Sequence, residues 1–463
     1  MKKLFIAAVV LGSIFSAISC SSLKKSTQSA RDFQLRSYQE ETLANGLKII
    51  FIDDSALPKI SLNLLVKVGA LNDPSSLEGL NLMTAGLLDQ GTATRSATQL
   101  ADEFAQLGTQ VSQSGDYDYS TVVTHGLATS KEKLLELFTD VVMNPSFQGK
   151  EIERVKAETT AALKQMVDNP GGYADLKMNE VLFASHPYAL PTMGTEASVK
   201  KIRQADVNRH YLRYYRPNNS ILAVTGQLTN EFRKKVKDAF AVWQYQEVNS
   251  PSRITPADSE GAPILLVSKA GLKQTQIRWG QLGIRRSDPA YMKLRLANIV
   301  LGGAFASRLN QKVRDDLGLT YSISSHFDAR QDLGSFEIST FTRNEKVGET
   351  IRATQNVIKE FRKGITSKEL AAAKAYLVGQ FPAVVETSDR LASNLMILRY
   401  YGVPDTYLSD FFKNVNSISL SDVNSIIDQY IQPQKMKVLV YADQEKVVSQ
   451  IKELGPFSVK TVQ

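Results

Sequence analysis

The chain has 463 residues, of which 43% are hydrophobic and 22% charged, so it has the composition of a folded protein and is long enough for more than one domain. Its formal net charge of +8 comes from 55 Lys and Arg against 47 Asp and Glu, a modest excess for this length. No arginine-rich run and no basic stripe interleaved with aromatic residues occurs, which excludes a typical nucleic-acid-binding protein. We therefore expect no nucleic-acid partner.

The first twenty residues have the pattern of an export signal. Lys2 and Lys3 precede an apolar run, residues 4–18, that is too short to span a bilayer as a stable helix. The run ends at Ala-Ile-Ser-Cys, which resembles a bacterial lipobox, and Cys20 is the only cysteine in the chain. We expect residues 1–20 to be a lipoprotein signal peptide and Cys20 to be lipidated. The alternative is an ordinary signal peptide with a chance cysteine.

These features predict an exported bacterial lipoprotein on the periplasmic side of the outer or inner membrane. Ser21 follows Cys20 in place of an acidic retention residue, which favours the outer membrane. The polar, basic residues 21–39 then form a tether between the membrane and the folded body. The four His residues are scattered and form no pair with metal-ligand spacing.

Hydrophobic periodicity and turn signals predict a first domain over residues 40–245. A hairpin is expected at 42–52, with an Asn-Gly turn, and the alternating residues 59–68 predict a half-buried strand. The remaining expected elements are helices at 78–94 (ending at Gly91), 96–107, 130–142, 150–167, 173–183, 205–215 and 229–240, and strands at 109–114, 119–127 and 220–225.

Residues 246–262 are rich in Ser, Pro and Gly, which is typical of a linker, after which residues 263–463 form a second domain. Strands are expected there at 274–282, 321–327, 334–341 and 436–441, and helices at 289–301, 307–316, 346–362, 367–381 and 421–430.

The second domain repeats the pattern of the first. Leu107-Gly108 corresponds to Leu317-Gly318, and Asp206-Val207-Asn208 corresponds to Asp422-Val423-Asn424, at a nearly constant offset. Each of these Asp-Val-Asn helices runs to a Tyr, then a Pro, then an apolar strand. The order and spacing indicate an internal duplication, and the fold class is therefore α+β.

Several motifs resemble the insulinase/pitrilysin superfamily, in particular its two-domain branch with the mitochondrial processing peptidase subunits. They are Glu78-Gly79-Leu80, residues 88–96, Asn144-Pro145-Ser146-Phe147, residues 214–219, and Arg314 with Gly318 to Ser322. The resemblance implies two duplicated domains, each a mainly antiparallel sheet with helices packed on it, that face each other like a clam shell.

In active members, the helix after the Gly-Leu pair carries H-x-x-E-H, whose two His bind zinc and whose Glu activates water. Those positions correspond here to Leu82, Ala85 and Gly86, so the motif is lost. Glu158, with Glu151 two turns before it, lies where a further zinc ligand is expected. Without His partners we interpret Glu158 as a relic or as part of a solvated helix face. We expect no metal and no cofactor in this chain, and no catalytic residue acting alone.

The resemblance also assigns roles in the second domain. Arg314 and Tyr321 match the Arg and Tyr that hold the substrate carbonyl and stabilise the oxyanion. Gly302 and Gly303 lie where non-catalytic subunits have a glycine-rich loop. The simpler alternatives are that Arg314 pairs with Asp315 or a Glu on a surface helix, that Tyr321 fills a strand face and that the two glycines end a helix.

The first hypothesis is a zinc-free subunit that pairs with a zinc-bearing homologous subunit, as a heterodimer that cleaves unfolded peptides. Zinc would then sit in the partner, and this chain would supply Arg314 and Tyr321. The second hypothesis is a non-enzymatic peptide-binding or assembly lipoprotein that uses the same chamber. An independent peptidase is a weaker third hypothesis, because no Ser, Cys or paired-Asp motif offers another hydrolytic mechanism.

Overall fold

The structure is a computed structural model, and it describes residues 34–249, 255–256 and 263–461. The signal peptide, Cys20, most of the tether and most of the linker lie outside the described residues. The chain from Arg36 onward forms one contact unit. Among the described helices, none combines the length and the apolar character that a membrane crossing requires.

The first half of the chain forms a six-stranded sheet in the order β1-β2-β6-β3-β5-β4. All neighbours are antiparallel except β2 and β6. The strands are β1 (Gln39–Thr42), β2 (Lys48–Asp53), β3 (Lys59–Val66), β4 (Val111–Gly115), β5 (Ser120–Leu127) and β6 (Ser220–Gly226). The expected hairpin is present, since β1 and β2 pair from Thr42 opposite Lys48.

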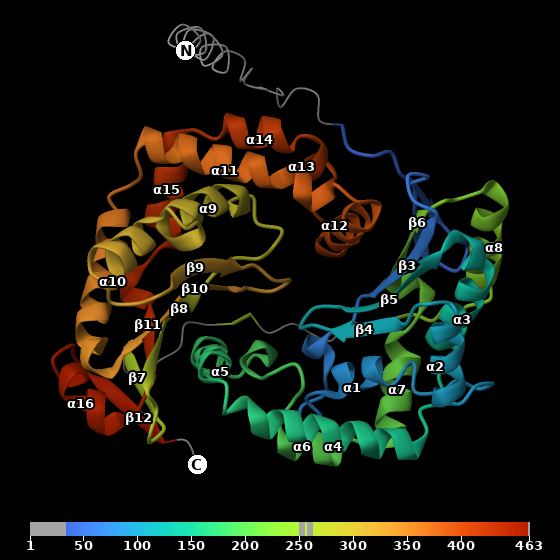
Figure 1. The fold of residues 1–463 in the computed structure, drawn as a ribbon, viewed down its shortest axis with the longest axis horizontal. Helices are drawn as coiled ribbons and strands as arrows, with labels where there is room; N and C mark the ends of the chain where they lie inside the picture. Colours follow the sequence, from blue (N-terminus) through green and yellow to red (C-terminus); the bar gives the residue numbers. More distant parts are fainter. Residues whose placement is uncertain (1–33, 250–254, 257–262, 462–463) are drawn as a thin grey trace, which may run out of the picture. The chain divides into compact units, whose positions relative to one another are not determined.

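Apart from α5, which packs elsewhere, the helices of the first half lie mainly on one face of this sheet, around a core that includes Phe138 and Phe240 (Figure 1). They are α1 (Leu80–Gly86), α2 (Ala97–Gln106), α3 (Lys131–Met143), α4 (Gly149–Met166), α5 (Pro170–Phe183), α6 (Glu196–Lys201), α7 (Gln204–Tyr214) and α8 (Asn230–Ala241). Ser96 caps α2 by accepting a hydrogen bond from the Gln99 backbone N–H, as its position in the sequence predicted.

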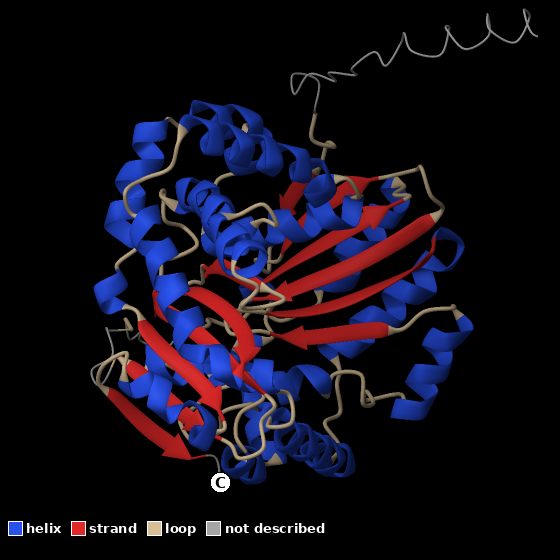
Figure 2. Cartoon of the chain, turned by 60° about the vertical axis from the view of Figure 1, so that its left-hand side comes forward, coloured by secondary structure: helices blue, strands red, loops and turns tan. Residues whose placement is uncertain are grey.

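The second half builds a sheet of the same design, in the order β12-β7-β11-β8-β10-β9. Figure 2 shows the strands of the structure in red. Here β7 is parallel to both of its neighbours and the other pairs are antiparallel. The strands are β7 (Ile264–Ser268), β8 (Gln274–Leu282), β9 (Ile323–Asp328), β10 (Ser335–Arg343), β11 (Lys437–Ala442) and β12 (Phe457–Thr461).

Its helices are α9 (Tyr291–Asn298), α10 (Val347–Phe361), α11 (Ser367–Val385), α12 (Ser388–Tyr401), α13 (Thr406–Ser409), α14 (Phe411–Ser417), α15 (Leu420–Tyr430) and α16 (Gln444–Lys452). Two further segments are π-helical, Ile299–Gly303 and Asn310–Asp316. The sequence predicted ordinary helices at both places. The wider turn of the first segment lets Gly302 and Gly303 pass close to neighbouring side chains.

The duplication is confirmed by matching local geometry. Asp206 in α7 and Asp422 in α15 both lie at the third helical position and close a capping box, accepting from the backbone N–H of Arg203 at 3.0 Å and of Ser419 at 2.9 Å. The glycines that follow Leu107 and Leu317 both have positive φ, +68° and +59°. The two halves therefore repeat one fold, each a mainly antiparallel sheet with helices packed on it.

Helix α12, from the second half, covers the other face of the first sheet. Lys59 at the start of β3 forms an ion pair with Asp389 at 2.6 Å, and Asn63 donates to Ser393 Oγ at 3.2 Å. The strand expected at 59–68 is present as β3, but the prediction that only half of it is buried was wrong. Ser61 and Leu65, on the second face of β3, are buried because α12 lies over them.

Helix α5, from the first half, covers the corresponding face of the second sheet (Figure 1). Met178 and Leu182 of α5 pack with Leu439 of β11 in one apolar cluster. Gly280 of β8 makes room for them, since a Cβ there would lie 2.8 Å from Leu182 Cδ1. The two halves thus exchange one helix each, and we call α5 and α12 the exchanged helices.

The helices differ from the expectation in two further places. The helix expected at 78–94 ends at Gly86, because the following residues turn so that Thr92 can bridge Pro145. Helix α12 was missed altogether, although Thr387 accepts from the Arg390 N–H at its start and Gly402 has a positive φ at its end.

Candidate functional site

The place of the zinc motif is the short helix α1. Ala85 is fully buried, and Leu82 lies against β4, where a Cβ on Gly115 would come within 3.4 Å of its Cδ1. A Cβ added to Gly86 would meet no heavy atom within 4 Å. None of the three residues has a side-chain nitrogen, oxygen or sulfur that could bind a metal. These residues do not fit a zinc ion.

Polar groups beside α1 hold the start of the helix in place. Asp73 accepts from the backbone N–H groups of Gly79 and Asn81, both at 2.8 Å, at the N-terminus of α1. Burial raises the pKa of Asp73 to about 8. His210 Nε2 lies 3.3 Å from Asn81 Oδ1, and burial lowers the pKa of His210 to about 3, so this imidazole is neutral.

The expected relic, Glu158, is engaged by a neighbouring arginine. Arg154 donates to Glu158 at 2.7 Å and to Glu151 at 2.8 Å, and its remaining nitrogen reaches Gln90 Oε1 at 2.7 Å. Glu151 and Glu158 therefore share one face of α4, as their spacing predicted. The side chain of Glu158 is 62% exposed, which fits the interpretation of a solvated helix face. No group of three or more potential metal ligands occurs within the described ranges.

The second half brings Arg314 and Tyr321 together. The guanidinium carbon of Arg314 lies 5.5 Å from the centre of the Tyr321 ring and 4.6 Å from the centre of the Phe305 ring. The only ion-pair contact of Arg314 within the described chain is a long one, 3.9 Å to Asp315. Tyr321 is 78% exposed and lies just before β9, so it does not fill a strand face. The arrangement is a cation between two open aromatic rings.

Gly302 and Gly303 shape the loop that carries Phe305. A Cβ on Gly302 would lie 2.5 Å from Ser325 Oγ, and one on Gly303 would lie 2.7 Å from Asn298 Nδ2. Gly302 therefore permits a close approach of the π-helical segment to β9, and Gly303 lets the segment fold tightly on the end of α9. The two glycines therefore do more than end a helix. Their close packing fixes the turn from which Ala304 and Phe305 follow directly.

Phe305 is the member of this cluster that sequence reasoning missed. It is 71% exposed, and we name Phe305, Arg314 and Tyr321 the arginine–aromatic cluster. A large apolar residue directly after Gly-Gly-Ala, in a turn, was the available signal.

Two other motifs of the family resemblance are structural. Thr92 Oγ1 and Arg95 Nη1 both donate to Asp140 at 2.7 Å, and the Ala93 N–H donates to the Asn144 carbonyl at 2.9 Å. The segment 91–95 is thereby held against the Asn-Pro segment at 144–145. Two motifs that are distant in the sequence thus form two loops that pack against each other.

Comparison with known proteins agrees with this geometry. Residues 48–196 match the family described as insulinase, peptidase family M16, and residues 201–377 match the peptidase M16 inactive domain. A solved structure of a peptidase M16 inactive domain from Pseudomonas fluorescens superposes with a TM-score of 0.81 at 28% identity, covering 88% of this chain and 98% of that one.

Two bacterial relatives illustrate the range of names. A Helicobacter pylori protein named non-peptidase homolog YmxG is 25% identical over 96% of this chain and 100% of its own length. A Bacillus subtilis protein named uncharacterized zinc protease YmxG is 24% identical over 84% of this chain and 94% of its own length. With its duplicated fold and its apolar α1, the chain belongs to the insulinase family, peptidase family M16, as a member that lacks the zinc motif.

Proposed function

We propose that this chain is the non-catalytic subunit of a heteromeric metalloendopeptidase. A zinc-bearing homologous subunit supplies H-x-x-E-H, and this chain supplies Arg314 and Tyr321 to an unfolded peptide substrate. The observation that carries the proposal is the arginine–aromatic cluster, which keeps a cation and a phenol accessible in a chain whose zinc positions are apolar.

The exposure of the cluster supports a binding role. Phe305 and Tyr321 are 71% and 78% exposed, although burial of an aromatic ring is favourable by a few kcal/mol. The Arg314 guanidinium lies over the Phe305 ring and has no short ion pair to a carboxylate within the described residues. Its N–H donors therefore remain available to a substrate oxygen.

The chemistry assigned to the pair is electrostatic. Arg314 donates from a planar guanidinium to the carbonyl oxygen of the peptide bond, and the Tyr321 hydroxyl donates to the same oxygen as negative charge develops. Neither group activates water or acts as a nucleophile, so the chain has no peptidase activity by itself. Zinc and the general base come from the partner.

Mixing the purified chain with a zinc-bearing homologue from the same organism tests this assignment. The mixture should hydrolyse an unfolded peptide that neither subunit cleaves alone. Arg314→Ala and Tyr321→Phe should each lower kcat by about 10²-fold or more while the subunits still co-purify. Arg343→Ala, an exposed arginine at the end of β10, is the matched control. Full activity with Arg314→Ala would overturn the proposal.

The second candidate is a peptide-binding or assembly protein that does not cut. It is favoured by the name non-peptidase homolog carried by the Helicobacter pylori relative. Under this hypothesis the cluster binds peptides in the isolated chain, and Arg314→Ala weakens that binding without any zinc-bearing subunit. Co-purification from membranes distinguishes the two, because the first candidate requires a chain with H-x-x-E-H in the complex.

The proposal also includes a membrane anchor. Lipidated Cys20 would hold the chain on the periplasmic side of the membrane, with the outer membrane preferred. Cys20→Ser should release the protein from the membrane fraction and prevent labelling by a fatty-acid precursor. Unchanged membrane retention with no label would show that Cys20 is not the anchor.

A further inference from the structure

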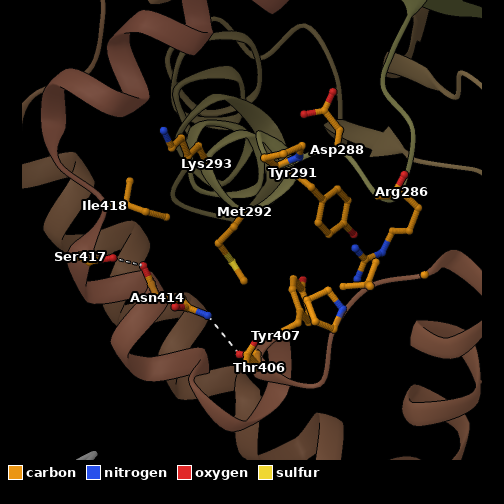
Figure 3. A pocket seen from close by; sticks show the side chains of 15 residues that line it. Arg286, Asp288, Tyr291, Met292, Lys293, Thr406, Tyr407, Asn414, Ser417 and Ile418 are labelled. Atoms are coloured by element: carbon orange, nitrogen blue, oxygen red, sulfur yellow. Dashed lines mark hydrogen bonds between the residues drawn. The ribbon is translucent and has the colours of Figure 1, made fainter.

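We propose that a cavity between α9 and the α13–α14 pair is a binding site for a carboxylate attached to a small apolar body. The cavity has a volume of about 410 Å³ and is bounded by the turn before α9, by α9 itself and by residues 402–418 (Figure 3). It shares no lining residue with the arginine–aromatic cluster, so the proposal stands apart from the proposed function.

Arg286 is the group that points to an anion. Its guanidinium carbon lies 4.1 Å from the centre of the Tyr291 ring and 4.7 Å from the centre of the Tyr407 ring. Figure 3 shows the guanidinium beside the Tyr291 ring at one side of the cavity. The two rings, 6.4 Å apart, orient the guanidinium without neutralising its charge. Within the described parts of the chain, Arg286 forms no ion pair with a carboxylate.

The other charged groups that line the cavity are Lys293 and Asp288. Lys293 Nζ lies 2.9 Å from Asp422 Oδ1, so its charge is compensated. Asp288 Oδ1 accepts the Ala290 N–H at 2.7 Å at the start of α9. Just behind the wall, Arg295 donates to the Tyr407 hydroxyl at 3.2 Å, which adds a second positive group near Arg286. Asp288 keeps its negative charge in this arrangement, and Arg286 and Arg295 together outweigh it, so the remaining positive charge favours an anionic ligand.

The remaining wall selects an apolar body. The cavity is lined by Met292, Val403, Pro404 and Ile418, and a flexible thioether can adapt to ligands of different shape. The volume is at the lower end of the range for small-molecule sites, which admits a single terminal residue or a short acyl chain and excludes a folded segment. A planar guanidinium binds a carboxylate through two parallel hydrogen bonds. A peptide C-terminus and a short fatty acid share this chemistry, which is a carboxylate on an apolar group about the size of one residue.

Titration of the full chain with N-acetyl-leucine and with octanoate, followed by calorimetry, tests the site. N-acetyl-leucinamide, which keeps the body and removes the charge, should bind at least about tenfold more weakly than N-acetyl-leucine. Tighter binding of N-acetyl-leucine than of octanoate assigns the site to a peptide C-terminus, and the reverse order assigns it to a fatty acid.

Arg286→Met should weaken carboxylate binding by at least about tenfold, whereas Arg285→Ala, which removes the same charge one residue away, should leave it unchanged. If Arg286→Met lowers the unfolding temperature, Arg286→Lys, which keeps a charge, replaces it. Carboxylate binding by Arg286→Lys is then compared with binding by Arg285→Ala. Equal binding of acid and amide, equal binding by both variants, or no binding of either carboxylate at about 10 mM would overturn the proposal.

Discussion

The carboxylate of Asp118 accepts a hydrogen bond from the hydroxyl of Tyr401 at 2.8 Å, which joins the first half of the chain to an exchanged helix of the second. The same carboxylate accepts from the Tyr188 hydroxyl and, at 2.9 Å, from the Gln331 N–H. The hydroxyl of Tyr400 donates to the Asp118 carbonyl at 2.6 Å. Asp118 is buried, and burial raises the pKa of its carboxyl.

Asp118→Ala is expected to lower the free energy of unfolding by about 3 kcal/mol, because it leaves the buried Tyr188 hydroxyl and two half-buried donors without this acceptor. Asp118→Asn should cost less, since an amide oxygen still accepts. Urea denaturation monitored by circular dichroism measures both values. The neighbouring exposed carboxylate, Asp116→Ala, is the control, and equal stability of the Asp116 and Asp118 variants would contradict the role of this contact.

Gly302→Ala is expected to cost about 1–3 kcal/mol, because the new methyl group would lie 2.5 Å from Ser325 Oγ and the packed turn must shift. Gly379→Ala, in the interior of α11, meets no atom within 4 Å and should stabilise the protein by up to about 1 kcal/mol. Thermal unfolding of the two variants compares them directly. A Gly302→Ala protein as stable as wild type would show that the close approach is not required.

His210 predicts a loss of stability in acid. Its pKa is about 3 in the folded chain against 6.5 when unperturbed, so the unfolded state binds more protons between these values. Stability from this group is therefore complete above pH 6.5 and falls by up to about 1.4 kcal/mol for each pH unit below it. His210→Gln should remove this slope, and the exposed His125→Gln should keep it. Parallel pH profiles for wild type and His210→Gln would contradict the expectation.

Metal removal should have no effect on the isolated chain. Because Leu82, Ala85 and Gly86 offer no ligand, dialysis against a chelator is expected to leave the unfolding temperature unchanged. Elemental analysis of the protein before dialysis should find less than stoichiometric zinc. A drop in unfolding temperature on chelation, reversed by added zinc, would reveal a metal site made by other residues.

Local signals in the sequence were sufficient for most strands and helices, because capping residues and alternation act over a few neighbours. Ser96 at the start of α2 and the hairpin at β1–β2 are examples. The failure at β3 has a long-range cause, whereas α12 was missed although local capping residues flank it. The second buried face of β3 depends on α12, which is distant in the sequence, and no periodicity within 59–66 reports it.

The contacts of the candidate site also fall into those that local sequence indicates and those that depend on the fold. Arg314 and Tyr321 belong to one short local motif, whereas the contact of Phe305 with Arg314 joins residues beside two separate π-helical segments. The engagement of Glu158 by Arg154 could be expected from their spacing of four residues, but the third contact, to Gln90, required the fold. Contacts between residues that are distant in the sequence could not be predicted from the sequence.

The exchanged helices bear on how such a chain could arise. In a single half, α5 or α12 would have no second sheet to cover, and one face of the half's own sheet would be exposed to solvent. Two identical copies of that half could cover each other by trading the same helix, which is the geometry of a domain-swapped symmetric dimer. The present chain has that arrangement within one polypeptide, with diverged halves. One half now has apolar or small residues at the zinc positions, while the other presents a cation and two aromatic rings at its surface.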